Sequence, residues 1–494
     1  MRLLTSYLIP FDRCAKLYAD NKLLVTVVMA GLLQFTLFKI LYPFPDFFSD
    51  SYSYVEAARQ RLGANIWPVG YSWFLVLMQP LSHNSLILVF IQYALVIASG
   101  FYLYRVMGKI FKPGRFTRKA LELFLFYNPL WLYLSNYVSS DALFFAGSML
   151  WFGQLLMIIK GAGKSIIWWH ALTVTSLFTL RYNALVYPVV SALAFLMVQR
   201  GFRYALRGIG ICVLGCLMFA GFTVWQNERL TGVRQFSIFS GWQLANNALY
   251  MYPYIHPDKE NLPFECRQLD WLTREYFTKL PQQDKHTSPV QGAVFIKNHF
   301  GPLKQYLELR RKRLPDAMQG AVGWGSVAPV FKLYGEYLVK SAPLAYAQFY
   351  LLPNAGNYFI PPLEKLSVYN MGEGILGAPA VEWFGWKSDR VYSVLPFSFQ
   401  GYLLFLMPYA FLAVNVLFAI GLLFWVINRG WQTEDRRVLK GLLLIGALLL
   451  VNFGFSVLAS PIVFRYQVFP MLLLLFLGVY LMEKDMHTAT DTLK

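Results

Sequence analysis

"GLLLIGALLLVNFGFSVLAS", residues 441–460, decides the fold class, because this stretch is almost entirely apolar and contains no charged residue. A helix of about 20 apolar residues spans the roughly 30 Å hydrocarbon core of a membrane. Residues 462–482 form a second run of this kind, and others recur along the 494-residue chain. Only 14% of the residues are charged, whereas about a quarter are charged in a typical soluble domain. The sequence therefore predicts an all-α protein that crosses a membrane repeatedly.

The apolar runs predict about ten transmembrane helices, joined by juxtamembrane helices and one large extracytoplasmic loop region. The expected spans are residues 22–42, 85–107, 119–135, 141–160, 165–180, 183–199, 208–226, 400–427, 441–459 and 462–482. They divide the chain into an N-terminal transmembrane module (1–226), an extracytoplasmic loop domain (227–399) and C-terminal transmembrane helices (400–494). The loop domain is too long for a plain connection, so we expect it to fold against the membrane helices and to carry function.

The basic residues predict the orientation. The net charge is +18, and Lys and Arg gather in every second connection: Arg2, Arg13, Lys16 and Lys22; Lys109, Lys112, Arg115, Arg118 and Lys119; Lys160 and Lys164; Arg200, Arg203 and Arg207; Arg429, Arg436, Arg437 and Lys440; Lys484 and Lys494. The positive-inside rule then places both termini in the cytoplasm. This pattern of short basic loops indicates membrane orientation and not nucleic-acid binding. The long loop lacks an Asn-x-Ser/Thr acceptor, which favours a bacterial cytoplasmic (inner) membrane.

The first predicted outer loop, residues 43–84, contains two helical patterns. "YSYVEAARQRLG" (52–63) predicts a short helix that ends before Gly63. Ser53 and Glu56 have the spacing of a capping box, so we expect the helix to begin there. "WPVGYSWFLVLMQPL" (67–81) is apolar but too short to span a membrane, and we expect it to lie in the membrane interface.

Four ionisable residues fall at the predicted outer ends of the spans: Asp50, Asp141, Arg181 and Arg465. Charged side chains at membrane depth are costly and usually face a protein interior or a wet cavity. Taken singly, each aspartate could be a helix N-cap, and each arginine could reach lipid phosphates. The coincidence of two acids and two guanidinium groups at one face instead favours a shared site.

The order of several short motifs resembles a known family. "SDSYSYVEAA" (49–58), "WPVGYSWFLVLM" (67–78), "SSDALFF" (139–145), "LRYNALVYP" (180–188) and "FRYQVFPMLLLL" (464–475) occur in succession. They resemble the polyprenyl-phosphate-sugar-dependent glycosyltransferases of the GT-C fold, in particular the protein O-mannosyltransferases and aminoarabinose transferases. The resemblance covers the first seven spans and, more loosely, the last, but not the long outer loop.

The resemblance implies that a sugar moves from a polyprenyl-phosphate donor to an extracytoplasmic hydroxyl of a glycan, glycolipid or protein, with inversion. Its active site would face the extracytoplasmic side. The implied catalytic acids are Asp50 in the first outer loop, with Asp46 a weaker match, and Asp141, and the implied phosphate-binding residue is Arg181. We also expect Arg465, Tyr54, Tyr182 and Asp46 to bind substrate. No metal-ligand spacing occurs in the sequence, so no cofactor is predicted, although a divalent metal stays open.

This chemistry needs these residue types. A carboxylate within hydrogen-bond reach of the acceptor hydroxyl can remove its proton, the role that we assign to Asp50. Negative charge near the anomeric carbon suits an oxocarbenium-like transition state. Asp141 could supply this charge or orient the acceptor. Arginine binds phosphate through two parallel charge-assisted hydrogen bonds, so Arg181 and Arg465 would stabilise the departing lipid phosphate.

Three other functions stay open. A flippase or transporter of lipid-linked sugars would place charges near the membrane midplane and often has an internal repeat, which the sequence lacks. A surface-polysaccharide polymerase or ligase would also have a long outer loop, but should not need the acid in the first loop. A structural membrane subunit would leave the acids unexplained. The long loop also contains Trp324, Trp383 and Trp386, which could stack on an acceptor sugar, although a core or membrane-interface position is the simpler interpretation for most of them.

Overall fold

The computed structural model describes residues 21–258, 260–281, 285–312 and 320–492. Within these ranges the chain is helical and has no strand. Six of the described helices are long and apolar enough to cross a membrane: Lys22–Leu41, Ser85–Phe111, Asp141–Lys160, Phe202–Thr231, Phe399–Ile427 and Arg436–Ala459. The all-α membrane character is therefore confirmed, while ten spans stay a prediction. Arg2, Arg13, Lys16 and Lys494 of the predicted basic connections lie outside the described residues.

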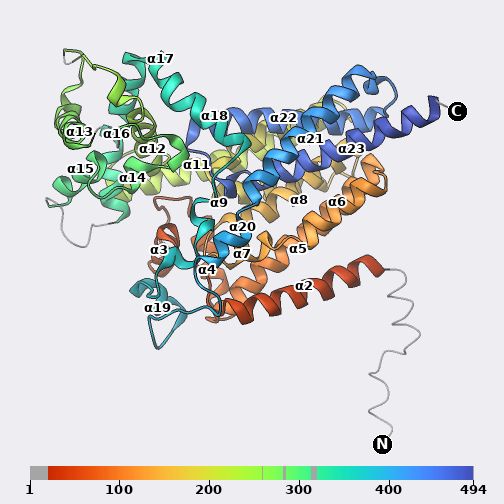
Figure 1. Cartoon of the computed structure of the whole chain (residues 1–494), viewed down its shortest axis with the longest axis horizontal. Helices are drawn as coiled ribbons and strands as arrows, with labels where there is room; N and C mark the ends of the chain where they lie inside the picture. The colour runs from red at the N-terminus through yellow and green to blue at the C-terminus, as the bar shows by residue number, and fades with distance from the viewer. Residues whose placement is uncertain (1–20, 259, 282–284, 313–319, 493–494) are drawn as a thin grey trace, which may run out of the picture.

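The long helices form an elongated bundle along the horizontal axis of Figure 1. Its principal helices are α2 (Lys22–Leu41), α5 (Ser85–Phe111), α8 (Asp141–Lys160), α9 (Ile166–Leu180), α10 (Tyr187–Met197), α11 (Phe202–Thr231), α21 (Met407–Ile427), α22 (Arg436–Ala459) and α23 (Val468–Thr492). Short elements flank them: η1 (Tyr182–Val186), α20 (Phe399–Leu404), η10 (Gly430–Gln432) and η11 (Phe464–Tyr466). The buried side chains of the bundle form the largest apolar core, which includes Leu103, Trp151, Phe152 and Leu472.

The predicted span 119–135 is wrong as a single helix. The chain forms α6 (Arg115–Phe126) and α7 (Leu130–Asn136), with a break between them. Pro129 lacks an N–H group and disfavours a helical conformation for the residue before it. The Asn128 side chain accepts a hydrogen bond from the Leu130 N–H at 3.0 Å, which starts the second helix.

Two other predicted boundaries differ from the structure. Helix α11 ends at Thr231, and Gly232, with a φ of +71°, is its C-cap. The predicted domain boundary at residue 226 therefore lies inside a helix. Helix α23 begins at Val468 and not at Ile462. Arg465 therefore lies in the connection between α22 and α23, where its side chain can turn toward neighbouring segments.

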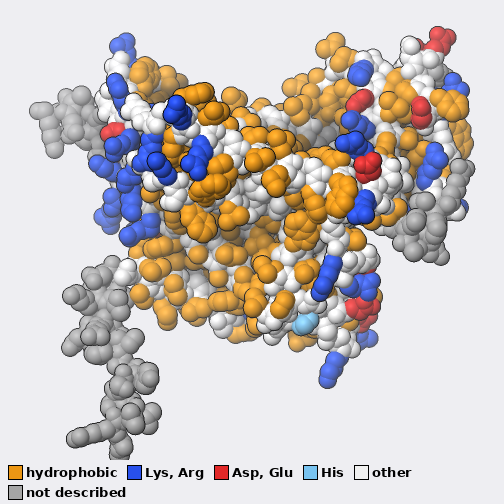
Figure 2. Space-filling view, turned by 180° about the vertical axis from the view of Figure 1, so that it is seen from behind, with side chains coloured by type: hydrophobic (Ala, Val, Ile, Leu, Met, Phe, Trp, Pro, Cys, Tyr) orange, Lys and Arg blue, Asp and Glu red, His pale blue; other side chains and the backbone are white. Residues whose placement is uncertain are grey.

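The two ends of the bundle differ in their content of basic residues. Helix α2 begins and α23 ends at the same end of the bundle (Figure 1). Lys and Arg side chains gather at this end in Figure 2, and the exposed basic residues of the α5–α6 and α21–α22 connections include Lys112, Arg115, Arg118, Lys119, Arg436 and Arg437. This asymmetry agrees with the positive-inside pattern, and the assignment of this end to the cytoplasm stays a prediction.

The first outer loop forms α3 (Ser49–Arg59) and α4 (Gly70–Met78). The predicted start at Ser53 is wrong, because α3 begins four residues earlier with Phe48 as its N-cap. The Ser51 hydroxyl accepts the Phe48 N–H at 3.1 Å, whereas Ser53 hydrogen-bonds to Asn65. Helix α4 is too short to cross a membrane, as predicted.

The long loop divides into two parts. In the first part, α12 (Ile238–Leu249), α13 (Arg267–Lys279), α14 (Val294–Lys297), α15 (Pro302–Arg311) and α16 (Ala321–Ser341) share a second apolar core, with short turns η2 (Tyr252–Tyr254), η3 (Phe264–Cys266) and η5 (Pro289–Gln291) between them. This part projects beyond the bundle end opposite the basic end (Figure 1). It continues into α17 (Pro343–Tyr346), the π-helical η7 (Ala347–Leu351) and α18 (Leu352–Phe359).

The second part of the long loop returns to the first outer loop. It contains η8 (Glu364–Ser367), η9 (Tyr369–Gly372) and α19 (Ala378–Phe384). Trp383 of α19 packs in one apolar cluster with Phe47 and Tyr71 of the first outer loop. The two predicted outer regions thus fold together, and η8 is held beside the end of the helix bundle.

The tight packing of α12 on α16 generates a stability prediction. A Cβ atom on Gly241 would lie 2.1 Å from the carbonyl oxygen of Ala328, so Gly241→Ala must push the two helices apart. We expect a destabilisation of about 1–3 kcal/mol, measured as a lower thermal unfolding temperature of the detergent-purified protein. The matched control is Gly356→Ala on α18, where a Cβ atom meets nothing within 4 Å and should not destabilise the protein. Equal unfolding temperatures for the two variants would contradict the packing.

Candidate functional site

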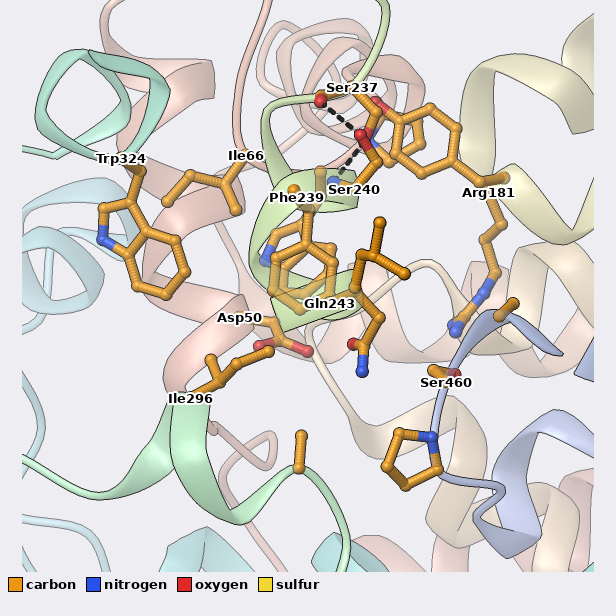
Figure 3. A pocket seen from close by; sticks show the side chains of 18 of the residues that line it. Asp50, Ile66, Arg181, Ser237, Phe239, Ser240, Gln243, Ile296, Trp324 and Ser460 are labelled. Atoms are coloured by element: carbon orange, nitrogen blue, oxygen red, sulfur yellow. Dashed lines mark hydrogen bonds between the residues drawn. The ribbon is translucent and has the colours of Figure 1, made fainter. Parts of the chain in front are cut away.

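A large cavity lies between the end of the helix bundle and residues 43–84 and 227–399, the two segments predicted to lie outside the membrane, which we call the outer region. Its volume is about 1440 Å³, and it is lined by α3, η1, α12, α16, η8 and the connection from α22 to α23. Figure 3 shows Asp50 and Arg181 on its walls, with Gln243 pointing between them. The predicted residues that line the cavity are Asp50, Asp141, Arg181, Arg465, Tyr54 and Tyr182. The structure therefore brings together all but one of the predicted site residues.

Arg465 lies at the centre of the charged groups. Its Nη1 atom is 3.0 Å from Asp141 Oδ2, and its Nη2 atom is 3.7 Å from Asp50 Oδ2. Its Nε atom lies 3.7 Å from Glu364 Oε2. Only 6% of the Arg465 side chain is exposed. One buried guanidinium group thus faces three carboxylates from three distant segments, so the interpretation that Arg465 extends to the headgroup phosphates of the surrounding bilayer is wrong.

Arg181 holds the other side of Asp141. It follows the last residue of α9, where an extended conformation (φ −153°, ψ 144°) turns its side chain out of the helix. Its Nη1 atom forms an ion pair with Asp141 Oδ1, and its guanidinium carbon lies 4.7 Å from the ring centre of Tyr466. Arg181 therefore faces the protein interior and not lipid.

The two aspartates lie in the first turns of helices but are not their N-caps. Phe48 is the N-cap of α3 and Ser140 is the N-cap of α8, so the capping interpretation of Asp50 and Asp141 is wrong. A carboxylate in the first turn is nevertheless stabilised by the positive end of the helix dipole. Asp141 is 3% exposed and paired with two arginines, whereas Asp50 is 15% exposed on the cavity wall.

Two charged residues that adjoin the predicted aspartate–arginine cluster were not predicted. Lys365 Nζ donates to Asp50 Oδ2 at 3.0 Å, and Glu364 pairs with Lys297 as well as lying near Arg465. Both belong to η8, where an adjacent Glu–Lys pair looks like an ordinary exposed turn in the sequence. Their place in the site depends on how the second part of the long loop folds back, and no local signal encodes that.

The electrostatics of Glu364 reflect this position. Burial alone would raise the pKa of its carboxyl group, but Arg465, Lys297 and Lys365 outweigh burial and lower the pKa to about 2. Burial lowers the pKa of Lys365, while Asp50 opposes that effect. The Glu364 backbone has a φ of +51°, a left-handed conformation that is uncommon for residues other than glycine and that often marks functional sites.

Asp46 does not line the cavity, so its predicted substrate-binding role has no support in the structure. It is buried, and its Oδ1 atom accepts the Asn370 N–H at 2.9 Å. Its own backbone pairs with Asn136 and Val138 at 2.8 Å and 3.0 Å. Burial raises the pKa of Asp46 well above its ordinary value. Asp46 therefore joins η9 and the end of α7 to the first outer loop.

The cavity combines positive charge with apolar surface. Seven Lys or Arg side chains line it against four carboxylates. Its lining also contains apolar side chains, among them Leu185 of η1, Phe455 and Leu458 of α22, and Leu333 of α16. Among the described residues, no group of three or more His, Cys, Asp or Glu side chains is placed to hold a metal ion. The arrangement suits a ligand that has both an anionic group and a hydrocarbon chain.

Comparison of the chain with protein-family models, curated proteins and solved structures found no match.

The low pKa of Glu364 generates a prediction of pH dependence. A carboxylate whose pKa is lower in the folded than in the unfolded protein stabilises the fold above its unfolded pKa, and this contribution is lost as the pH falls toward the folded value. We therefore expect Glu364→Gln to destabilise the protein most above about pH 5, and the difference from the wild type to shrink toward about pH 3. Thermal unfolding of both proteins across this range measures the effect.

Glu382→Gln is the control for this series, because Glu382 forms an exposed ion pair with Arg59 and should contribute little at any pH. A Glu364→Gln effect that is independent of pH would show that Glu364 acts by packing alone.

Proposed function

We propose that the protein is a membrane glycosyltransferase that moves a sugar from a polyprenyl-phosphate donor to an acceptor hydroxyl of a glycan, glycolipid or protein. One observation carries this proposal. Asp50 and Asp141 lie with Arg181, Arg465 and Lys365 in one cavity at the end of the helix bundle. The motif resemblance supports the same function, and we expect the cavity to open on the extracytoplasmic side.

The cations suit the leaving group. When the sugar–phosphate bond breaks, negative charge develops on the lipid phosphate. Arginine can hold phosphate oxygens by two parallel hydrogen bonds, and preorganised charges in a site shielded from water stabilise developing charge strongly. Arg465, Arg181 and Lys365 would bind the phosphate, while apolar lining side chains such as Leu185 and Leu458 would contact the hydrocarbon chain.

The two aspartates differ in how strongly they are engaged, and this suggests separate roles. Asp141 accepts from Arg181, from Arg465 and from the Ser139 hydroxyl at 2.8 Å, so it would position the two arginines. Asp50 Oδ2 faces Lys365, while its Oδ1 atom accepts only a long 3.3 Å bond from Ser49. This oxygen is therefore the better general base for an acceptor hydroxyl.

The transporter alternative fits this geometry less well. The charged groups lie where α8 begins and where α9 and α22 end, and not midway along the helices, where coupling sites of transporters are typically found. A polysaccharide polymerase or ligase would make use of the large outer region, but the acid in the first outer loop favours the transferase.

We predict that Asp50→Asn abolishes sugar transfer. The amide has nearly the same shape but cannot remove a proton, and general-base catalysis contributes at least about 100-fold. The assay supplies purified protein with a panel of polyprenyl-phosphate sugars and measures the released lipid phosphate. The surface variant Glu382→Gln should retain the wild-type rate. Near-normal turnover of folded Asp50→Asn protein would exclude Asp50 as the base.

We also predict that Arg181→Gln raises the KM for the lipid donor by about 10- to 100-fold, because it removes a charge-assisted hydrogen bond to the phosphate. The KM for the acceptor should change little. Arg59→Gln, which removes a surface cation, is the control. An unchanged donor KM in Arg181→Gln would remove this residue from the donor site.

A further inference from the structure

The cavity continues past the charged cluster into the outer region, and the lining changes there. Trp67 of the first outer loop, Phe239 of α12 and Trp324 of α16 line this outer half. Figure 3 shows Trp324 and Ile66 on the opposite side of Asp50 from Arg181. We call the three aromatic residues Trp67, Phe239 and Trp324 the aromatic wall.

The aromatic wall is held in place by its own contacts. The rings of Trp67 and Phe239 lie 4.3 Å apart, and Phe239 and Trp324 are 6.4 Å apart with nearly parallel planes. Trp242 stacks behind Trp324 at 4.0 Å, and its Nε1–H donates to the Trp324 carbonyl oxygen at 3.1 Å. A rigid wall of this kind presents a large apolar surface at little entropic cost, and suits the flat face of a sugar ring.

A lysine without an anionic partner adjoins this wall. Lys304 Nζ lies 4.1 Å from the ring centre of Trp324 and 5.5 Å from that of Trp242. Among the described residues, no carboxylate lies within 4.0 Å of it, whereas Lys297 is paired with Glu364 and Lys332 lies 3.9 Å from Glu336. Burial lowers the pKa of Lys304.

The position of Lys304 in its helix is also unfavourable for a cation. It is the third residue of α15, in the first turn, where the helix dipole disfavours positive charge. Glu308, one turn further along α15, partly offsets the effect of burial on Lys304, but its carboxylate is paired with Arg311 at 2.7 Å. An arriving anion would therefore stabilise this half-buried cation.

Gln243 of α12 also lines the cavity, and Figure 3 shows its amide between Asp50 and Arg181, where it can bind a hydroxyl group of a ligand. Asn247 holds this side chain by accepting a hydrogen bond from Gln243 Nε2 at 2.8 Å.

We propose that the outer half of the cavity binds the acceptor, and that this acceptor is an acidic saccharide. One of its sugar rings would pack on the aromatic wall, its carboxylate or phosphate would pair with Lys304, and the reacting hydroxyl would reach Asp50. This inference rests on the proposed transferase function, and it adds the chemical class of the acceptor.

The test measures binding and needs no turnover. Purified full-length protein is titrated with three oligosaccharides of equal length: a neutral one, one with a uronic acid and one with a phosphate ester. We expect the wild type to bind at least one acidic oligosaccharide about 10-fold more tightly than the neutral one, the value of one charge-assisted hydrogen bond. Lys304→Met should remove this preference without weakening neutral binding, and Lys304→Arg should restore it. Lys387→Met, at an exposed lysine outside the cavity, is the matched control.

The possible outcomes distinguish an acceptor site at Lys304 from a donor site and from the transferase function itself. Equal wild-type affinity for all three oligosaccharides, or an undiminished preference in Lys304→Met, overturns the inference. If Lys304→Met instead weakens binding of polyprenyl phosphate as much as that of the acidic oligosaccharides, Lys304 belongs to the donor site and the acceptor assignment is overturned. If the wild type prefers acidic oligosaccharides but releases lipid phosphate from no donor, the saccharide site is supported and the transferase function is contradicted.

If the wild type transfers sugar to neutral acceptors only, the transferase function is supported and the acidic acceptor is overturned.

Discussion

The buried guanidinium group of Arg465 is the constraint on which the rest of the site depends. It lies in the connection between two long helices and faces Asp50, Asp141 and Glu364, which come from three distant segments. A buried charge must be paired, and removing one partner of such a pair typically costs about 3–5 kcal/mol. The first outer loop, the start of α8 and the returning η8 are therefore held at one point by electrostatics.

This constraint links the membrane fold to the proposed chemistry. The charged groups lie where α8 begins and where α9 and α22 end, so charges that are far apart in the sequence meet at one end of the bundle. The outer region then encloses these charges in a cavity, where positive charge, apolar side chains and the aromatic wall line one continuous space. In the proposed function, the hydrocarbon chain of the donor would lie on the apolar side chains and the acceptor on the aromatic wall. The bond that reacts would lie between them, at the charged cluster. The weakly engaged oxygen of Asp50 lies where the two would meet.

Local patterns in the sequence predicted the helices and the four principal charges, since apolar runs and basic loops already fix which helix ends share a face. The break at Pro129 is also a local feature, but it lies within a run whose hydropathy suggests one continuous span. Glu364 and Lys365 could not be predicted as site residues from the sequence, because their position depends on how the second part of the long loop folds back onto the first outer loop. Asp46 and Asp50 are only four residues apart, and nothing in the local sequence shows that Asp50 lines the cavity while Asp46 is buried outside it.

The most direct test of the central claim is a cryo-electron microscopy structure of the Asp50→Asn protein saturated with polyprenyl phosphate. The account predicts phosphate density within hydrogen-bond distance of Arg465 and of Arg181 or Lys365, with the hydrocarbon chain along Leu185 and Leu458. Phosphate density at another site, or an empty cavity at saturating lipid, would contradict it.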